Sequence, residues 1–269
     1  MADHRFELHE MSVWSQIQGM AAADFREHFG ISLLHDRGGL RIRAHRTRDL
    51  SLNRVYGLGI ETPLTAEGLD RLIEEYKQAG ASRFMVSWAP VCRPEDAGHW
   101  FLERGFRRIP SVVRLTRRTD LHVHPASDLR VVEATVADTE RFGELAARCN
   151  ELPPEYAPGL NSTIGRPGWR HYFVLDGDRA IAAGALYVEG DVAWAGLGGT
   201  LPEDRRRGAQ TALLARRVRD ARADGARWIT SWTTAEGADR PNQSLRNMKR
   251  LGFEVSYELQ NFVLDLRPS

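Results

Sequence analysis

One segment of the sequence has residue types that suit the binding of a phosphate group. Residues 205–210 read Arg-Arg-Arg-Gly-Ala-Gln. They lie between a short, glycine-punctuated apolar run at 192–199, which predicts a strand, and a helical pattern that stops at Gly225. The N–H groups of the first helical turn would be free to bind an anion, and Gly208 would let that anion approach the backbone closely. The segment therefore predicts an anion-binding turn.

Length, composition and charge limit the classes of protein to consider. The chain has 269 residues, of which 42% are hydrophobic and 27% charged. This is ordinary for a soluble globular protein, and the length suits two domains. The net charge is +1 and the pI is near 7.9. We therefore expect neither nucleic acid nor a membrane as a partner.

Cysteine and histidine patterns argue against disulfides and metal sites. Cys92 and Cys149 are far apart and neither belongs to a CxxC pair. His122 and His124 have strand-like spacing but no third ligand close in sequence, so no metal is expected. The N-terminus lacks the apolar core of a signal peptide, and no apolar run is long enough to cross a bilayer. We expect a reduced, cytoplasmic protein.

The sequence repeats itself, which sets the expected architecture. Residues 80–88 (Gly-Ala-Ser-Arg-Phe-Met-Val-Ser-Trp) resemble residues 225–232 (Gly-Ala-Arg-Trp-Ile-Thr-Ser-Trp), and a Gly-Phe pair follows each at a similar distance, at Gly105 and Gly252. Each match is short, so chance is the alternative to duplication. Duplication predicts the same order in both halves: helix, hairpin strands, long strand, helix, strand, helix and a closing strand pair.

Turn residues and a weakly patterned segment divide the second half from the first. Asp-Gly-Asp at 176–178 predicts a hairpin turn, and Glu-Gly-Asp at 189–191 predicts a second turn before the arginine segment. Residues 118–127 carry little periodic apolar signal and are the expected linker. We place the boundary near residue 125, with domains at 1–124 and 125–269.

Two motifs make the second half resemble the GNAT superfamily of acyl-CoA N-acyltransferases. Residues 205–210 match that family's Q/R-x-x-G-x-G/A loop, except that Gln210 replaces a small residue, and residues 200–202 loosely match the V-x-P before it. Residues 242–253 align with the N-x-A-x-x-L-Y-x-K-x-G-F helix. There Ser244 replaces the alanine, and Met248 stands where the family often has tyrosine.

The resemblance implies an α+β fold with a mixed α/β sheet. Each of two GNAT-like domains would have a central, mostly antiparallel twisted sheet flanked by helices. The first domain resembles the fold more faintly. Its segment 61–68 has no arginine-glycine loop and carries Glu61 and Glu67 at the helix start, where negative charge repels phosphate. We therefore expect the first domain to be a degenerate copy that does not bind coenzyme A.

The resemblance also implies an acetyl-CoA-dependent N-acetyltransferase, with acetyl-CoA as co-substrate. Backbone amides at 207–210 would hold the pyrophosphate, the glycine-rich end of the preceding strand would pair with the pantetheine arm, and Asn242 would cap its helix. The alternative for these glycines is a bulge needed only for packing. The expected coenzyme-binding residues are Leu197, Gly198, Gly199, Thr200, Arg205, Arg206, Arg207, Gly208, Ala209, Gln210, Thr211, Asn242, Ser244 and Met248.

Acetyl transfer to an amine needs a base, a polarised thioester carbonyl and a proton for the thiolate. Glu236 is the candidate base, although an ordinary loop carboxylate is the simpler interpretation. Tyr257 and Ser244 are the candidate acids, with solvent as the alternative and a half-buried strand aromatic as the simpler interpretation of Tyr257. Backbone N–H groups around Leu197 would hold the oxyanion.

Two other classes of function compete with acetyl transfer to an amine acceptor. A non-catalytic acyl-CoA sensor or assembly module is the runner-up, because Met248 cannot donate a proton and no base is obvious. A nucleotide binder of the P-loop type fits poorly, since the chain lacks the Gly-Lys-Ser/Thr ending of that motif. The acceptor is not identified, and either a monomer or a homodimer is expected.

Overall fold

The chain forms two compact units, each built from separate stretches of sequence. The computed structural model describes residues 3–122, 127, 129–237 and 242–266. Unit 1 comprises Met1–Gly19, Ala23–Val113 and Ser256–Ser269, and unit 2 comprises Met20–Ala22 and Arg114–Val255. The boundary expected near residue 125 falls among residues 123–126, outside the described residues, and the division drawn there stays a prediction.

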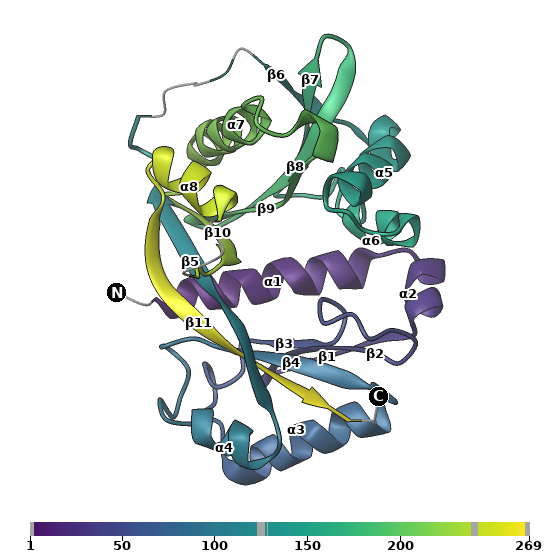
Figure 1. Cartoon of the computed structure of the whole chain (residues 1–269), viewed down its shortest axis with the longest axis vertical. Coiled ribbons are helices and arrows are strands. Elements are labelled where there is room, and N and C mark those ends of the chain that lie inside the picture. Colours follow the sequence, from purple (N-terminus) through teal and green to yellow (C-terminus); the bar gives the residue numbers. More distant parts are fainter. Residues whose placement is uncertain (1–2, 123–126, 128, 238–241, 267–269) are drawn as a thin grey trace. The chain divides into compact units, whose positions relative to one another are not determined.

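Unit 1 contains a mixed sheet with helices packed against it (Figure 1). The sheet has the order β1-β2-β3-β4-β11-β5. Strands β1, β2 and β3 pair antiparallel, β3 and β4 pair parallel, and β4 and β11 pair antiparallel. Its elements are α1 (His4–Met20), α2 (Ala23–Phe29), β1 (Ile31–Asp36), β2 (Gly39–Ala44), β3 (Arg54–Tyr56), α3 (Ala66–Gln78), β4 (Arg83–Trp88) and α4 (Gly98–Glu103).

Unit 2 has the same kind of sheet, in the order β6-β7-β8-β9-β10 with β5 beside β10. Pairing is antiparallel from β6 to β9 and parallel between β9 and β10. Its elements are β6 (Arg130–Ala134), α5 (Thr139–Cys149), α6 (Ala157–Leu160), β7 (Trp169–Asp176), β8 (Arg179–Glu189), β9 (Val192–Thr200), α7 (Ala209–Ala223), β10 (Trp228–Thr234) and α8 (Gln243–Arg250), with single turns of 3-10 helix at Val136–Asp138, Pro154–Tyr156 and Pro202–Asp204.

Two long strands contribute to both units. β5 (Arg107–Arg118) begins in unit 1 and ends in unit 2, whereas β11 (Glu254–Asp265) begins in unit 2 and ends in unit 1. In unit 1, β11 pairs with β4 from Gln260 opposite Trp88 to Asp265 opposite Arg83. Each unit is therefore completed by a strand whose remainder belongs to the other.

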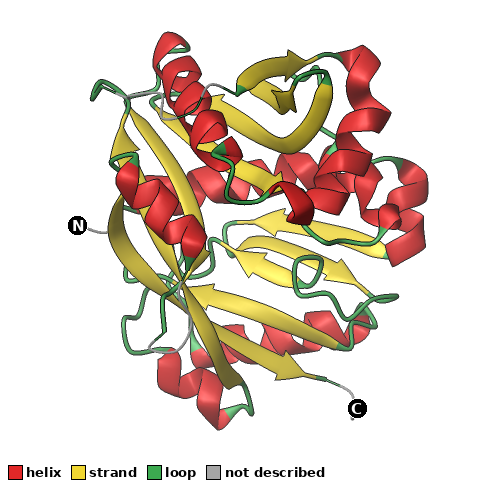
Figure 2. Ribbon diagram, turned by 45° about the horizontal axis from the view of Figure 1, so that its top comes forward, coloured by secondary structure: helices red, strands yellow, loops and turns green. Residues whose placement is uncertain are grey.

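The hairpins of unit 2 follow from their turn residues. Gly177 and Gly190 lie between β7 and β8 and between β8 and β9, each with φ of 60°, a conformation that glycine adopts without strain. Both predicted turns are confirmed. Figure 2 shows the resulting strands with helices against them.

Helices α5 and α7 cover opposite faces of β8 and β9 (Figure 1). A Cβ added at Gly199 would lie 2.7 Å from Cβ of Cys149 in α5, whereas one at Gly198 would lie 3.2 Å from Nη2 of Arg217 in α7. Adjacent strand residues point to opposite faces, so the small residues of β9 let both helices approach the sheet. Phe142, Leu145 and Phe173 belong to the core on the α5 side.

The internal repeat is visible in the order of elements. Each half runs through a hairpin, a strand, a helix, a strand, a helix and one long strand, where the sequence predicted a closing pair. The Ser-Trp pairs lie in β4 and β10, and Gly105 and Gly252, with φ of 82° and 77°, follow α4 and α8. The predicted fold class, a mixed sheet of mostly antiparallel strands with flanking helices, is confirmed. Among the described residues, every helix is too short or too polar to cross a membrane.

Candidate functional site

The arginine-glycine segment forms the turn between β9 and α7. After Thr200 the chain makes a single turn of 3-10 helix at Pro202–Asp204, and α7 then begins at Ala209. Gly208 is the N-cap with φ of 86°, in the left-handed region, and among the described residues no side chain caps the helix. The first N–H groups of α7 thus lack the side-chain acceptor that most helix starts provide. This geometry suits an anion placed against the backbone.

The three arginines of the turn have different environments. Arg207 donates to Asp204 at 2.8 Å and to Asp176 at 2.7 Å, and Arg205 pairs with Glu151. Arg206 is exposed, with φ of 67°. Among the described residues no hydrogen bond or ion pair engages its guanidinium. Two of the three charges are therefore already neutralised, and Arg206 is the one whose side chain is free for a phosphate.

Asp204 organises the turn from within. Its carboxylate is 2% exposed and accepts from Arg179 at 2.6 Å as well as from Arg207. The hydrogen bonds from Arg179 and then from Arg207 hold the pKa of Asp204 below its ordinary value. Gln210, which departs from the family pattern, donates to the hydroxyl of Thr200 at 3.3 Å. These contacts fix the turn without using the N–H groups at the start of α7.

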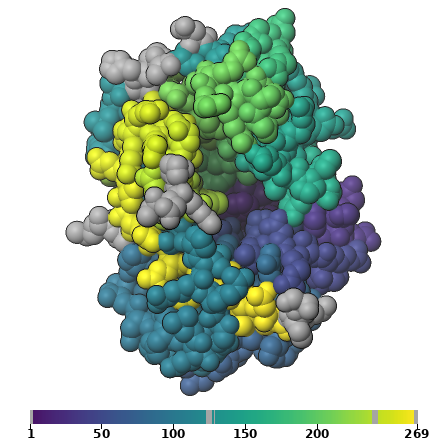
Figure 3. All heavy atoms as spheres, viewed as in Figure 1, coloured from purple at the N-terminus to yellow at the C-terminus, as the bar shows by residue number. Residues whose placement is uncertain are grey.

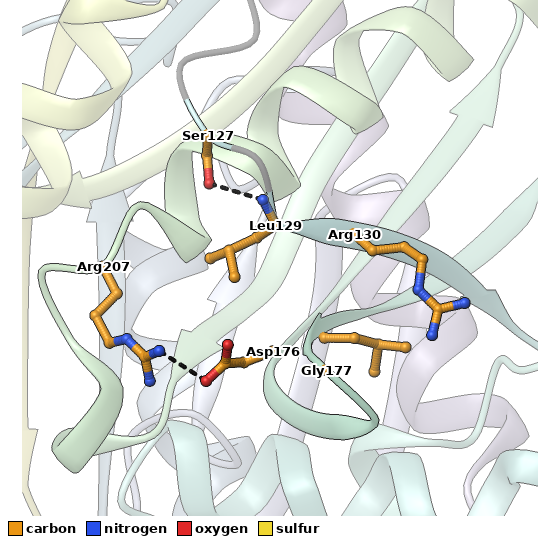
Figure 4. Close-up of a pocket in the computed structure, with 7 residues that line it drawn as sticks. Ser127, Leu129, Arg130, Asp176, Gly177 and Arg207 are labelled. Carbon is orange, nitrogen blue, oxygen red and sulfur yellow. Dashed lines mark hydrogen bonds and ion pairs between the residues drawn. The ribbon is translucent and has the colours of Figure 1, made fainter.

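A hollow of about 640 Å³ adjoins the turn, on the side of the β7–β8 hairpin (Figure 4). Ser127 and Leu129 line it on one side, and Asp176 and Arg207 line it on the other. In Figure 4 Arg207 points at Asp176, to which it donates. The hydroxyl of Ser127 would lie 3.1 Å from a Cβ added at Gly208. Any side chain at position 208 would therefore meet both backbone strain and a close neighbour.

A bulge interrupts β9 just before the turn. Ala185 of β8 pairs with Gly196, but Ala183 pairs with Gly199, so Gly184 stands opposite both Leu197 and Gly198. Leu197 has φ of 50°. Two residues against one is the definition of a β-bulge, which bends a strand and redirects its N–H and C=O groups. The bulge lies within the segment expected to meet the pantetheine arm.

Beside the bulge, the described ladder between β9 and β10 is short. Trp228, Ile229 and Thr230 pair with residues 192–194, although β9 continues to Thr200 and β10 to Thr234. The next β9 carbonyl, Ala195 O, accepts from the side-chain hydroxyl of Ser231 at 2.8 Å. A side chain thus takes the place of the backbone donor that a continued ladder would supply. The regular pairing of the two strands ends just before the segment where the sequence predicts coenzyme binding.

Asn242 caps α8 and ties it to β10. Its Oδ1 accepts from the N–H of Leu245 at 3.0 Å, and its Nδ2 donates to Thr233 Oγ1 at 3.0 Å and to Thr234 O at 2.6 Å. The predicted cap is therefore present. Ser244 lies exposed in the first turn of α8, and Met248 is buried. Helices α7 and α8 contact each other, and in Figure 3 their light-green and yellow atoms are neighbours on one face.

The candidate proton-transfer groups are held by other residues. Glu236 accepts from Arg246 Nη2 at 3.0 Å and from the N–H of Asn242 at 3.3 Å. These bonds, the backbone one foremost, hold the pKa of Glu236 below its ordinary value. Tyr257 belongs to unit 1, where its buried hydroxyl donates to Glu7 at 2.9 Å. A carboxylate with a lowered pKa is a weaker base, and Tyr257 already has an acceptor for its proton.

Solved structures of low sequence identity share this architecture. A GCN5-related N-acetyltransferase from Kribbella flavida matches with a TM-score of 0.63 and 17% identity, over 96% of this chain and 96% of that one. Another from Sphaerobacter thermophilus has a TM-score of 0.63 and 17% identity, over 89% of this chain and 77% of that one. The chain has the GNAT fold. The likeness to this superfamily predicted from the two motifs is confirmed at the level of the fold.

A relative with two such units also matches. A tandem GNAT protein from the clavulanic acid biosynthesis pathway aligns with a TM-score of 0.57 and 17% identity, over 80% of this chain and 75% of that chain. No family model and no curated protein matches the sequence. The likeness is therefore one of structure.

The unit 1 counterpart of the turn differs from the one in unit 2. Helix α3, which follows β3 as α7 follows β9, has Thr65 as its N-cap. The hydroxyl of Thr65 accepts from the N–H of Gly68 at 3.0 Å, and Glu67 lies in the first turn. A capped helix start with a carboxylate beside it disfavours phosphate. The start of α3 therefore differs from the start of α7 in both its cap and its charge.

Two residues of the GNAT-fold unit 2 were missed by the sequence analysis. Asp204 is flanked by charged residues and looks like a surface acid, although it is buried. Arg217 is 2% exposed inside α7. It stands four residues after Leu213 and four before Ala221, on the apolar face of the helix. In the sequence, an arginine at an apolar position of the helical pattern could have indicated that Arg217 is buried.

The cysteines are buried, and the positions of possible metal ligands are known only within the part of the chain that the structure describes. Burial raises the pKa of Cys92 to about 12 and that of Cys149 to about 11, so both thiols stay protonated at neutral pH. Among the described residues, no group of three His, Cys, Asp or Glu side chains is arranged to hold a metal ion. His124, which with His122 has strand-like spacing but is not expected to bind a metal, lies outside the described residues.

Proposed function

We propose that this protein is an acetyl-CoA-dependent N-acetyltransferase whose coenzyme site lies in unit 2. It would move an acetyl group to an amine by direct attack on the thioester. The start of α7 carries the proposal: Gly208 is in the left-handed conformation and, as a glycine, supplies no side chain to cap the helix. A GNAT fold supports acyl transfer in general, and this turn supports coenzyme A as the carrier.

The residues of the turn fit a pyrophosphate. Backbone N–H groups from Gly208 to Thr211 would bind its oxygens, since the dipole of α7 and the missing side chain at Gly208 both favour a close anion. The Arg206 guanidinium would add positive charge, while Arg205 and Arg207 shape the turn through their carboxylate partners. Thr200 and Gln210 would hold the end of β9 against α7.

The ends of β9 and β10 supply the second part of the site. Bound acetyl-CoA would provide a thioester whose carbonyl accepts negative charge during attack by the amine. N–H groups of the bulge, at Leu197 and Gly198, are the donors we assign to that oxygen. Asn242 and Met248 would line the α8 side, with Asn242 keeping α8 against β10.

For proton transfer the candidates are an exposed hydroxyl, an ion-paired carboxylate and solvent. Ser244 is exposed at the start of α8 and would act through water on the departing thiolate. Glu236 would act as base only after leaving Arg246, because an ion-paired carboxylate with a lowered pKa accepts a proton poorly. Tyr257 belongs to unit 1 and donates to Glu7, so we assign it no role in the unit 2 site. Thiolates leave readily near neutral pH, so solvent suffices as the acid.

Thiol release tests the proposal. The purified protein is mixed with acetyl-CoA and a panel of amines, including amino acids, amino sugars, polyamines and peptides with free N-termini. Amine-dependent release of free coenzyme A supports the transferase. Binding of acetyl-CoA with no release across the panel favours the alternative, a non-catalytic acyl-CoA sensor, to which the buried Met248 and the ion-paired Glu236 point.

A further inference from the structure

Helix α7 carries a charged side chain into the interior of unit 2. Arg217 is 2% exposed, and its neighbours Leu213, Leu214 and Val218 are buried apolar residues. Burial lowers the pKa of Arg217 to about 10, so the guanidinium stays charged at neutral pH. Among the described residues, no carboxylate lies within ion-pair distance of it.

The guanidinium is aimed at the bulge of β9. Its Nη1 donates to Ala185 O and to Gly196 O, both at 3.1 Å. Ala185 and Gly196 are the last regular pair before the bulge. The bulge interrupts the ladder at this point, and one side-chain nitrogen bridges the carbonyls of both strands.

Glycines make room for this arrangement. A Cβ at Gly198 would lie 3.2 Å from Nη2 of Arg217, and one at Gly184 would lie 3.3 Å from Nη1. The Nε of Arg217 is buried without a partner in the described part of the chain. A buried cation with no carboxylate is unfavourable, and an apolar side chain would fill the same space more favourably. Packing alone does not account for an arginine here.

The bond to Gly196 links Arg217 to the proposed reaction. Gly196 C=O and Leu197 N–H belong to the same peptide group, and a cation that binds the carbonyl polarises that group and strengthens its N–H as a donor. We propose that Arg217 is a positioning residue, which fixes the bulge of β9 and strengthens the Leu197 N–H as a donor to the acyl carbonyl. This inference rests on the function proposed above.

Substitutions on α7 test this role. Arg217→Met removes the charge but keeps a long, unbranched side chain. Arg217→Lys keeps the charge but replaces the planar guanidinium with a compact ammonium group. Arg219→Met is the matched control, since Arg219 is exposed on the same helix. We expect Arg217→Met to lower kcat about 10- to 100-fold, as the partial loss of an oxyanion donor would, with Kd for acetyl-CoA changed less than about threefold. Arg217→Lys should be intermediate and Arg219→Met unchanged.

A spectroscopic readout separates positioning from packing. The stretching frequency of the thioester carbonyl in bound, 13C-labelled acetyl-CoA reports its polarisation without turnover. It should be lower in the wild type than in Arg217→Met, and intermediate in Arg217→Lys. If Arg217→Met does not fold, the wild type and Arg217→Lys suffice.

Two patterns would overturn the inference. Equal carbonyl frequency and equal kcat in wild type and variants would remove the role altogether. Alternatively, the variants could lose thermal stability, coenzyme affinity and kcat in parallel while the carbonyl frequency stays unchanged. Arg217 would then contribute only to packing and stability. A wild type that neither binds nor turns over acetyl-CoA contradicts the proposed function instead, so the two failures are distinguishable.

Discussion

Gly208 is the residue on which the proposed coenzyme site most depends. Its φ of 86° suits glycine, and it places no side chain at the start of α7, where the anion is proposed to bind. The sequence predicted this residue from the pattern of residues 205–210 together with the strand-like run before it and the helical pattern after it. The ion pairs of Arg205 and Arg207 were not predictable, since their partners Glu151 and Asp176 are distant in sequence.

Substitution of Gly208 by alanine should weaken coenzyme binding more than it weakens the fold. A Cβ there is strained and meets Ser127, so we expect a loss of about 1–2 kcal/mol in the free energy of unfolding and about tenfold weaker acetyl-CoA binding. Gly225→Ala is the control, because Gly225 has φ of 89° with nothing within 4 Å of an added Cβ. Calorimetry and chemical denaturation of both variants would show the difference; equal Kd values would refute it.

Arg206 and Arg207 should respond in opposite ways to replacement by glutamine. Arg206→Gln removes an exposed charge beside the anion site and should weaken acetyl-CoA binding about two- to fivefold with unchanged stability. Arg207→Gln removes a partner of buried Asp204 and should lower the melting temperature. Binding isotherms and melting curves of the two variants would decide; the reverse pattern would mean that Arg207 is the phosphate ligand.

At the scale of elements, the proposed unit 2 site is formed by the end of β9, the start of α7 and the start of α8. The hairpins and helices here were predictable, because turn glycines and apolar periods mark them locally. For the glycines of β9 the sequence left two explanations, coenzyme binding and packing. The structure shows that packing contributes, because Gly198 and Gly199 each face a helix. Burial of Asp204 was not predictable, since it depends on Arg179 of another strand.

Acid should reveal the contribution of Asp204 to the β9–α7 turn. Its folded-state pKa lies below the unfolded value of about 3.9, so its contribution is complete above that value and is lost as pH falls through the folded pKa. Asp204→Asn should therefore be less stable than wild type at pH 7, and the gap should narrow below about pH 4. Denaturant midpoints from pH 7 to pH 3 measure this; a gap independent of pH would show that the charge contributes nothing.

At the scale of the molecule, the repeat was predictable but the composition of the units was not. Short matches around Ser87 and Ser231 indicated duplication, and both halves do share one order of elements. No local pattern indicates that β11 ends in unit 1 while β5 ends in unit 2, because strand pairing between distant segments leaves no periodic trace. The solved structures with this fold are only 17% identical to this chain, so in the sequence only the two motifs indicated the fold.

The first 124 residues should not fold on their own. Such a fragment lacks Ser256–Ser269, and with them the part of β11 that pairs with β4 and the tyrosine that binds Glu7. We expect weak chemical-shift dispersion and noncooperative melting from it, and a gain of structure when a peptide of residues 254–269 is added. A cooperative, well-dispersed fragment 1–124 without the peptide would show that unit 1 does not need β11.

The most direct test of the whole account is calorimetric titration of the full chain with acetyl-CoA, beside the variant Gly208→Glu. The account predicts one binding site per chain, because α7 offers an uncapped start and α3 is capped by Thr65, and it predicts that a carboxylate at position 208 abolishes binding. Absence of binding at millimolar acetyl-CoA, two sites per chain, or undiminished binding by the variant would contradict it.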